Sequence, residues 1–175
     1  GVGTVPYGCQ SDSRSELDRL MEQYGSSLLR MSALYLKDAS LAQDAVQETF
    51  LKAYRHLQDY RGESSEKTWL TAICVNTCRD LLRNPWLRRR SRTPLDSLPE
   101  KPADFDFPDN TVLTAVMGLP AKYREVVLLR YYEGLKLKEI AGALRLSDGK
   151  VRSRLNRANA LLRDRLKEWY YDEET

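Results

Sequence analysis

Two short helical patterns separated by a turn constrain the fold of this chain more than any other feature. Residues 137–144 carry apolar side chains at positions 137, 140, 141 and 144, which is the spacing of one buried helix face. After a turn at residues 145–147, Val151 and Leu155 lie four positions apart and define the buried face of a second helix. The sequence therefore predicts a helix-turn-helix, in which one helix braces another that contacts DNA.

The polar face of this second helix has the chemistry that DNA requires. Arg152, Ser153, Asn156 and Arg157 fall together on it, and guanidinium groups donate paired hydrogen bonds to guanine edges and phosphates. Eight basic residues stand against two acidic ones over residues 145–167. The net charge of the whole chain is only +3, so the local distribution of charge indicates nucleic acid and the total does not.

The rest of the chain also has helical periodicity. Apolar residues recur every three or four positions before and after a proline-rich middle, and no alternating strand pattern of useful length competes with them. The expected helices cover approximately residues 17–37, 46–57, 69–82, 111–117 and 121–132. Asp38 or Ser40 is a plausible N-cap of the second helix, and Pro120 suits a first helical turn. We expect an all-α fold.

The middle of the chain predicts a boundary between two domains. Five of the seven prolines lie between Pro85 and Pro108, interleaved with an arginine-rich run and then with an acidic one. Prolines at this density break helices and strands. We expect two small helical domains, residues 14–84 and 109–170, joined by an extended linker over residues 85–108. An ordered loop docked on one domain is the alternative.

The expected second helix has an organised polar face. Its members lie together on the side away from Val46 and Phe50, and they are Asp44, Gln47, Glu48, Lys52 and Arg55. A solvated face of an amphipathic helix explains such a set. The alternative is a docking surface for a helix of another protein.

The expected third helix places polar groups on an apolar stripe. Asn76 and Asp80 share this stripe with Trp69, Ile73 and Arg83, and a buried polar group is costly unless it is hydrogen-bonded. These residues either brace a neighbouring loop, or Asn76 points at a ligand. The preceding loop at residues 60–65 combines a tyrosine, an arginine and a glycine, so it could hold an extruded base by stacking. An ordinary helix connection is the alternative.

Nothing in the sequence indicates an enzyme. Cys74 and Cys78 fall on the apolar side of their helix, where small core residues are expected, and His56 is expected at the surface. The sequence contains no nucleophile elbow, glycine-rich phosphate loop or metal-ligand cluster, so we expect no cofactor and no metal.

The cysteine count and hydropathy indicate a cellular location. Cys9, Cys74 and Cys78 form an odd, scattered set, which does not describe a disulfide framework. No apolar run approaches the length that spans a bilayer, and residues 1–10 do not resemble a signal peptide. We expect a cytoplasmic protein without direct membrane insertion.

Several motifs, taken in order, resemble one family. Residues 44–54, Asp-Ala-Val-Gln-Glu-Thr-Phe-Leu-Lys-Ala-Tyr, resemble the signature of region 2 of bacterial sigma factors. Residues 60–63 and 68–70, with the Asn76, Asp80 and Arg83 series, continue that match. Residues 119–125 and the helix-turn-helix resemble region 4. The presence of only these two regions is similar to the extracytoplasmic-function (ECF) class of the sigma-70 family.

The resemblance implies a role for each surface. Asp44, Gln47, Glu48, Lys52 and Arg55 would bind core RNA polymerase at the β′ clamp helices, and region 4 would meet the β flap. The −10 promoter element would be captured and melted by Tyr60, Arg61, Gly62, Glu63, Ser64, Trp69, Asn76 and Arg83. The −35 element would be recognised by Lys150, Arg152, Ser153, Arg154, Asn156 and Arg157.

The resemblance also implies partners. Promoter DNA and core polymerase are expected, with an anti-sigma factor, often membrane-anchored, that holds the protein inactive; no small-molecule substrate is expected. The linker would thread toward the RNA exit path of the polymerase. Lys150 and Asn156 depart from the residues common in the family, so the −35 sequence cannot be carried over from relatives. Cys74 and Cys78 also depart from it and leave an opening for redox control.

Three other functions are compatible with parts of the sequence. A two-domain repressor or activator, whose N-terminal helices dimerise or sense a ligand, explains the C-terminal half but leaves the face of residues 44–54 and the Tyr60–Asn76 arrangement unexplained. A helical protein adaptor should tolerate charge reversal at Arg152 and Arg157. A redox enzyme that uses Cys74 and Cys78 should lose activity on Cys→Ser exchange.

Overall fold

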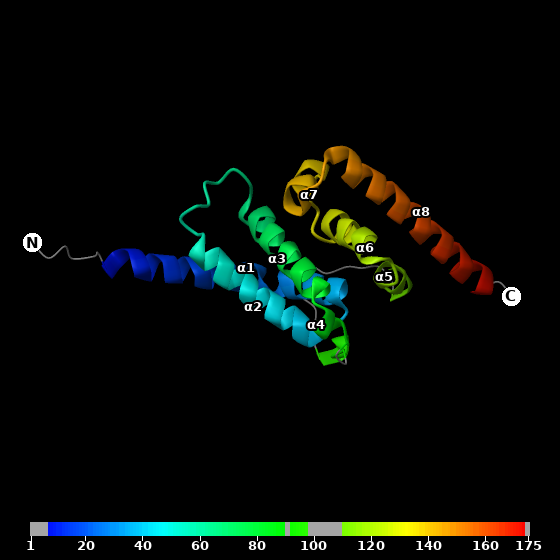
Figure 1. Ribbon diagram of the computed structural model, residues 1–175, viewed down its shortest axis with the longest axis horizontal. Helices are drawn as coiled ribbons and strands as arrows, with labels where there is room; N and C mark the ends of the chain where they lie inside the picture. Colours follow the sequence, from blue (N-terminus) through cyan, green and yellow to red (C-terminus); the bar gives the residue numbers. More distant parts are fainter. Residues whose placement is uncertain (1–6, 90–91, 98–109, 174–175) are drawn as a thin grey trace, which may run out of the picture.

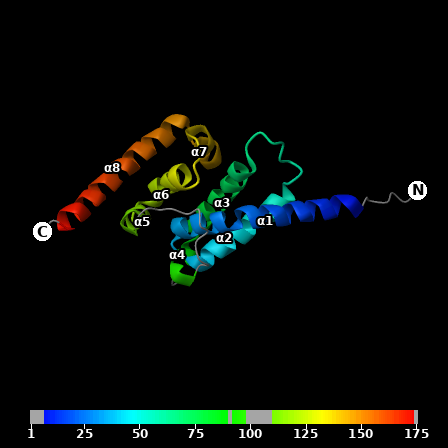
Figure 2. The same ribbon diagram turned by 180° about the vertical axis from the view of Figure 1, so that it is seen from behind.

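The computed structural model describes residues 7–89, 92–97 and 110–173, and all regular structure within them is helical (Figures 1 and 2). The all-α prediction is therefore confirmed for this part of the chain. The helices are α1 (Tyr7–Leu36), α2 (Ala39–Arg55), α3 (Glu66–Arg83), α4 (Pro85–Arg89), α5 (Asn110–Met117), α6 (Ala121–Val127), α7 (Leu137–Leu144) and α8 (Asp148–Glu173). A single 3-10 turn lies at Leu95–Ser97, and α6 continues into a π-helical turn at Leu128–Tyr132.

Short polar signals set the ends of the N-terminal helices. Lys37 has a left-handed backbone with φ of 57°, which stops α1. Asp38, one of the two caps that the sequence predicted, caps α2, because its Oδ1 accepts a hydrogen bond from the Leu41 N–H at 3.1 Å. Ser65 caps α3 in the same way through the Thr68 N–H, also at 3.1 Å. These caps orient α2 and α3 against α1, and the three helices form the first packed unit.

The predicted helix-turn-helix is present in α7 and α8. Arg145 ends α7 with a left-handed φ of 56°, and the Leu146 N–H donates back to the Ala141 carbonyl at 3.0 Å. Ser147 Oγ then accepts from the Lys150 N–H at 3.1 Å and supports the start of α8. Val151 and Leu155 are buried, as the four-residue spacing predicts. α5 and α6 pack on the inner side of α8 and complete the second unit.

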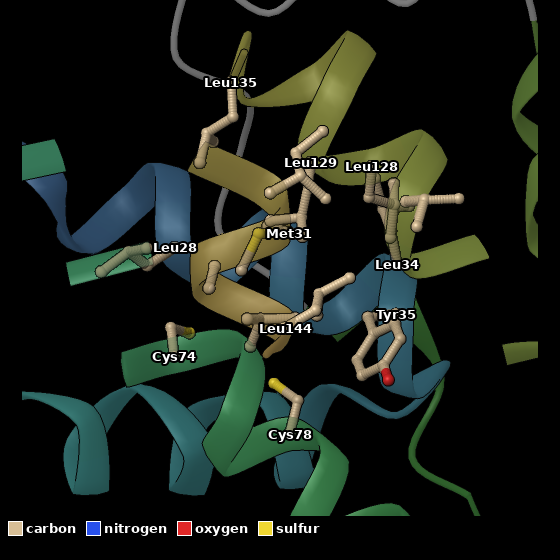
Figure 3. Close-up of a cluster of buried hydrophobic side chains, with 14 of the residues drawn as sticks. Leu28, Met31, Leu34, Tyr35, Cys74, Cys78, Leu128, Leu129, Leu135 and Leu144 are labelled. Carbon is tan, nitrogen blue, oxygen red and sulfur yellow. The ribbon is translucent and has the colours of Figure 1, made fainter. Parts of the chain in front are cut away.

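The two units pack directly on each other and share one hydrophobic core. In both views α3 lies between α2 and α7 (Figures 1 and 2), and α3 contacts α7 extensively. The close-up of this core brings together side chains from both halves of the chain (Figure 3): Leu28, Met31, Leu34, Tyr35, Cys74, Cys78, Leu128, Leu129, Leu135 and Leu144. Buried apolar residues of α3 and α7 belong to this one cluster, so the two helices cover one another. The predicted domain boundaries remain a prediction.

The predicted extended linker is wrong over the part that the structure describes. Pro85–Arg89 is helical, because proline suits a first helical turn and Asn84 Oδ1 accepts from the Trp86 N–H at 3.0 Å. Thr93 is docked on the first unit, where its carbonyl accepts from the Ala39 N–H at 3.1 Å. This ordered stretch resembles the alternative of a docked loop. Residues 90–91 and 98–108 of the linker lie outside the described residues.

Within the described ranges, no helix is both long and apolar enough to cross a membrane.

Candidate nucleic-acid interface

A groove of about 840 Å³ runs along α3 and contains the predicted polar stripe. Trp69, Asn76 and Arg83 line it, together with Ile73 and Asp80, as the helical spacing predicts. Lys52 and Arg55 of α2, with His56 at the end of that helix, form one edge, and residues 142–146 of α7 and its turn form the opposite one. The structure therefore brings residues predicted for two different roles, on α2 and α3, into one basic groove.

The side-chain amide nitrogen of Asn76 donates two hydrogen bonds inside this groove. Its Nδ2 donates to the Ala72 carbonyl at 2.8 Å and, across the groove, to the Ala143 carbonyl of α7 at 2.8 Å. Asp80 does not intrude on the apolar face: its side chain is 69% exposed and lies 3.9 Å from Arg83 Nη1. Of these two residues, only Asn76 therefore requires a polar partner within the protein. The Ala143 carbonyl of α7 is such a partner.

The predicted base-holding loop encloses a pocket of about 350 Å³. The Tyr60 ring stacks on Trp69 with centroids 4.7 Å apart, and the Tyr60 hydroxyl donates to the Ser64 carbonyl, which closes the loop. Gly62 adopts a φ of 75°, a conformation that favours glycine. The pocket is lined by Asp59, Tyr60, Arg61, Glu63, Ser64 and Trp69. Its aromatic side and polar rim can hold a planar base by stacking and edge hydrogen bonds.

The polar face of α8 projects into solvent. Its exposed members are Lys150, Arg152, Ser153, Asn156 and Arg157, which we call the α8 face. Arg154 differs from them, because its side chain is only 19% exposed and its Nη1 lies 3.4 Å from Glu125 Oε1. The structure thus places five of the six predicted −35 residues on one open surface and turns Arg154 inward against α6.

The outer side of α2 carries most of its predicted set. Asp44, Gln47 and Arg55 are exposed and Glu48 is half-buried, whereas the Lys52 Nζ donates to Thr77 Oγ1 of α3 at 3.0 Å. Leu51 and Tyr54 lie on the same side and are 51% and 42% exposed. Neither residue was among the predicted site residues, although their spacing from Asp44 and Gln47 repeats every seven residues. We call Asp44, Gln47, Glu48, Leu51, Tyr54 and Arg55 the α2 face.

The buried cysteines have no access to solvent. Cys74 and Cys78 are free and fully buried, and Cys74 Sγ lies 3.1 Å from Ser32 Oγ. A hydrogen bond between the two sulfurs lowers the pKa of Cys74 and raises the pKa of Cys78. They therefore pack as the small core residues that the sequence predicts. In the part of the chain that the structure describes, no group of acidic, cysteine and histidine side chains is arranged to hold a metal.

Comparisons with known proteins place these surfaces in a family context. A family model described as sigma-70 region 2 matches residues 20–93, and one described as sigma-70 region 4 matches residues 109–162. The RNA polymerase sigma-H factor of Pseudomonas aeruginosa is 32% identical over 169 residues, which cover 85% of each chain. The ECF RNA polymerase sigma-E factor of Haemophilus influenzae is 28% identical over 176 residues and 90% of each chain. The solved structure of CnrH in complex with the cytosolic domain of CnrY is similar with a TM-score of 0.64 and 25% identity, over 89% of this chain and 90% of that one.

Proposed function

The chain belongs to the sigma-70 family as an RNA polymerase sigma factor of the ECF class, and from this premise we propose how its surfaces divide the work of initiation. The family consists of transcription factors and not of enzymes. The observation that carries the proposal is the presence, in one chain, of an aromatic-lined pocket at residues 59–69 and an open arginine-rich face on α8.

The α2 face is the docking surface for core polymerase, at the β′ clamp helices. It combines two exposed apolar side chains, Leu51 and Tyr54, with exposed Asp44, Gln47 and Arg55. An apolar centre with a polar rim is the usual anatomy of a protein interface. Lys52 supports this surface from behind through its hydrogen bond to Thr77.

The −10 surface is formed by the loop pocket and the groove of α3. Tyr60 and Trp69 offer stacking area, and Asn76 and Arg83 offer hydrogen-bond donors further along α3. A base extruded from the duplex would enter the loop pocket, and the following nucleotides would lie along the groove. Base–aromatic stacking contributes about 1–3 kcal/mol per base, which offsets part of the cost of unpairing during promoter melting.

The α8 face recognises the −35 element in the major groove. Arg152, Ser153, Asn156 and Arg157 are exposed on a helix whose opposite side is anchored by Val151, Leu155 and Ala158. A rigid helix that presents arginine and asparagine can form bidentate contacts to guanine and adenine edges. The second unit, including this helix, would also contact the β flap of the polymerase.

An anti-sigma factor is the expected regulator. CnrH, the structural relative at 25% identity, is in complex with the cytosolic domain of CnrY. By analogy, a partner that covers the α2 face or the −10 surface of this chain would keep it from polymerase or from DNA.

Transcription with purified bacterial core polymerase on a promoter library tests the proposal. We expect initiation at a discrete set of promoters only when the chain is present. The double variant Arg152→Glu, Arg157→Glu should abolish this initiation, whereas Arg163→Glu, which changes an exposed arginine further along α8, should retain it. Absence of promoter-specific initiation, together with absence of a complex with core polymerase on a sizing column, would overturn the proposal.

A further inference from the structure

We propose that the chain has a binding site for a free oligophosphate, a ligand with two or more adjoining phosphate groups, where the linker and α6 meet the end of α1. Four cationic side chains form it, and we call them the cation cluster: Lys37, Arg92, Arg124 and Arg165. The cation cluster shares no residue with the α2 face, the α8 face or the lining of the groove and the loop pocket. The inference therefore goes beyond the proposed function.

A buried arginine forms the base of the cation cluster. Arg124 of α6 is 4% exposed, and its Nε and Nη2 donate to the Tyr35 carbonyl of α1 at 3.0 and 2.6 Å. Its Nη1 donates to the Leu119 carbonyl, just before α6, at 2.7 Å. Lys37 follows Tyr35 closely in sequence and ends α1 with its left-handed backbone. The Arg124 guanidinium therefore lies close to Lys37.

The linker and α8 each add an exposed cation. The carbonyl of Thr93 accepts from the first N–H of α2 at 3.1 Å, which docks the linker beside Lys37, and Arg92 directly precedes Thr93. Arg165 of α8 reaches the turn between α5 and α6, where a Cβ added at Gly118 would collide with its Nη1. Arg92 and Arg165 are exposed and Lys37 is half-buried. A ligand in solvent can therefore reach three of the four cations.

The charges of the cation cluster are not balanced by acidic side chains. Within the described residues, no carboxylate forms an ion pair with Lys37, Arg92 or Arg165. Burial and the three neighbouring guanidinium groups lower the pKa of Lys37. The end of α1 carries roughly half a negative charge, which offsets only part of the positive charge of the cluster. A ligand with several negative charges would relieve the remaining repulsion.

Two carboxylates beside the cation cluster are already engaged. Glu125 of α6 accepts a hydrogen bond from the Tyr35 hydroxyl. The same carboxylate lies 3.6 Å from Arg79 Nε and 3.4 Å from Arg154 Nη1. Asp38 is 1% exposed, and its Oδ1 caps α2. Because both carboxylates are buried with partners of their own, they leave the exposed cations available to an external anion.

The arrangement favours a compact ligand over a nucleic-acid backbone. The four cations come from the end of α1, the linker, α6 and α8, and they converge on one helix end. A nucleic-acid strand spreads its phosphates along its length and is matched by a basic stripe or helix face, such as the α8 face. Adjoining phosphates concentrate charge and acceptor oxygens, which suits guanidinium donors that surround one ammonium group. A free oligophosphate therefore fits the cluster better.

Calorimetric titration of the full-length chain with sodium tripolyphosphate tests this inference. Lys37→Met and Arg165→Met each remove one charge of the cluster. Arg163→Met is the matched control, because it removes an exposed arginine of the same helix outside the cluster. Gly118→Ala retains every charge but displaces the Arg165 guanidinium with its Cβ. Sulfate at equal ionic strength is the control ligand, and short random single strands are the competing polyanion.

We expect one equivalent of tripolyphosphate to bind and to raise the temperature of thermal unfolding, because a ligand of the native state stabilises it. Lys37→Met and Arg165→Met should each weaken binding at least about fivefold, and Gly118→Ala at least about threefold. Arg163→Met should change binding by less than about twofold, because solvent and salt screen its charge. A loss with Gly118→Ala cannot come from net charge. Circular dichroism checks that each variant stays folded.

Three results would overturn the site. If sulfate binds as tightly as tripolyphosphate, the cluster does not recognise adjoining phosphates. If Arg163→Met and Arg165→Met lose equal affinity, the cause is the general charge of α8. If single strands bind through Lys37 and Arg165 while tripolyphosphate does not, the cluster is a nucleic-acid contact. Because transcription is not measured, each of these results leaves the proposed function intact.

Discussion

The two surfaces that we assign to promoter DNA differ in what covers them. The α8 face stands on the outside of the molecule, with its arginine side chains in solvent and its anchor residues Val151 and Leu155 buried beneath. The groove of α3 is roofed by the end of α7, and Asn76 already has a partner there. A surface for duplex DNA can face solvent, because it needs only charged groups and hydrogen-bond donors. A surface for an extruded strand also needs aromatic and apolar side chains, and covering these removes apolar area from water.

Removal of Glu125 should have the largest effect, because this residue connects the covered surface to the open one. Glu125→Ala leaves the side chains of Arg79 and Arg154, 21% and 19% exposed, without their carboxylate. Loss of one partner from a buried charge pair costs about 3–5 kcal/mol. Chemical denaturation of the variant should show a loss in this range, while Glu16→Ala, at a half-exposed pair that solvent screens, should lose much less. Equal losses would contradict the role of Glu125.

Arg152→Ala should affect the open surface alone. We expect a loss of about 1–3 kcal/mol in binding to duplexes that contain the −35 element, with an unchanged free energy of unfolding, because the side chain is exposed. Titration of labelled duplexes with and without a scrambled −35 sequence checks this. An equal loss on both duplexes would assign Arg152 to phosphate contacts only.

Trp69→Ala should affect the covered surface alone. The variant loses the ring that stacks on Tyr60, so strand capture should weaken by about 1–3 kcal/mol while −35 duplex binding is retained. Permanganate footprinting of the melted region, with core polymerase present, measures the effect. Trp86→Ala is the matched control, since Trp86 is 70% exposed and lies outside both pockets. Normal melting with Trp69→Ala would remove this residue from the −10 surface.

Ser65→Ala should produce the smallest change. Ser65 Oγ caps α3 next to the loop pocket, and loss of an N-cap costs about 0.5–2 kcal/mol. We expect a small loss of stability and a somewhat weaker capture of the −10 strand, because the start of α3 positions Trp69. Hydrogen exchange of the first turn of α3 should increase, and the amides of α8 should stay unchanged.

Local sequence signals predicted much of each helix. The Asp38 cap, the Val151 and Leu155 spacing and the position of Cys74 and Cys78 in the core were all correct, because each depends on residues within one or two helical turns. The linker prediction was wrong at Pro85 for a local reason too: the same proline that breaks a helix interior starts a helix when Asn84 caps it.

The tertiary structure alone decided which polar residues face DNA and which hold the two units together. The sequence determined an all-α chain with a helix-turn-helix, because helical periodicity and caps are short-range. It placed Arg154 with the DNA-facing arginines and left the partner of Asn76 open. The structure turns Arg154 toward Glu125 and gives Asn76 a carbonyl of α7. Those partners lie 29 and 67 positions away along the chain, so only the packing of one helix on another could reveal them.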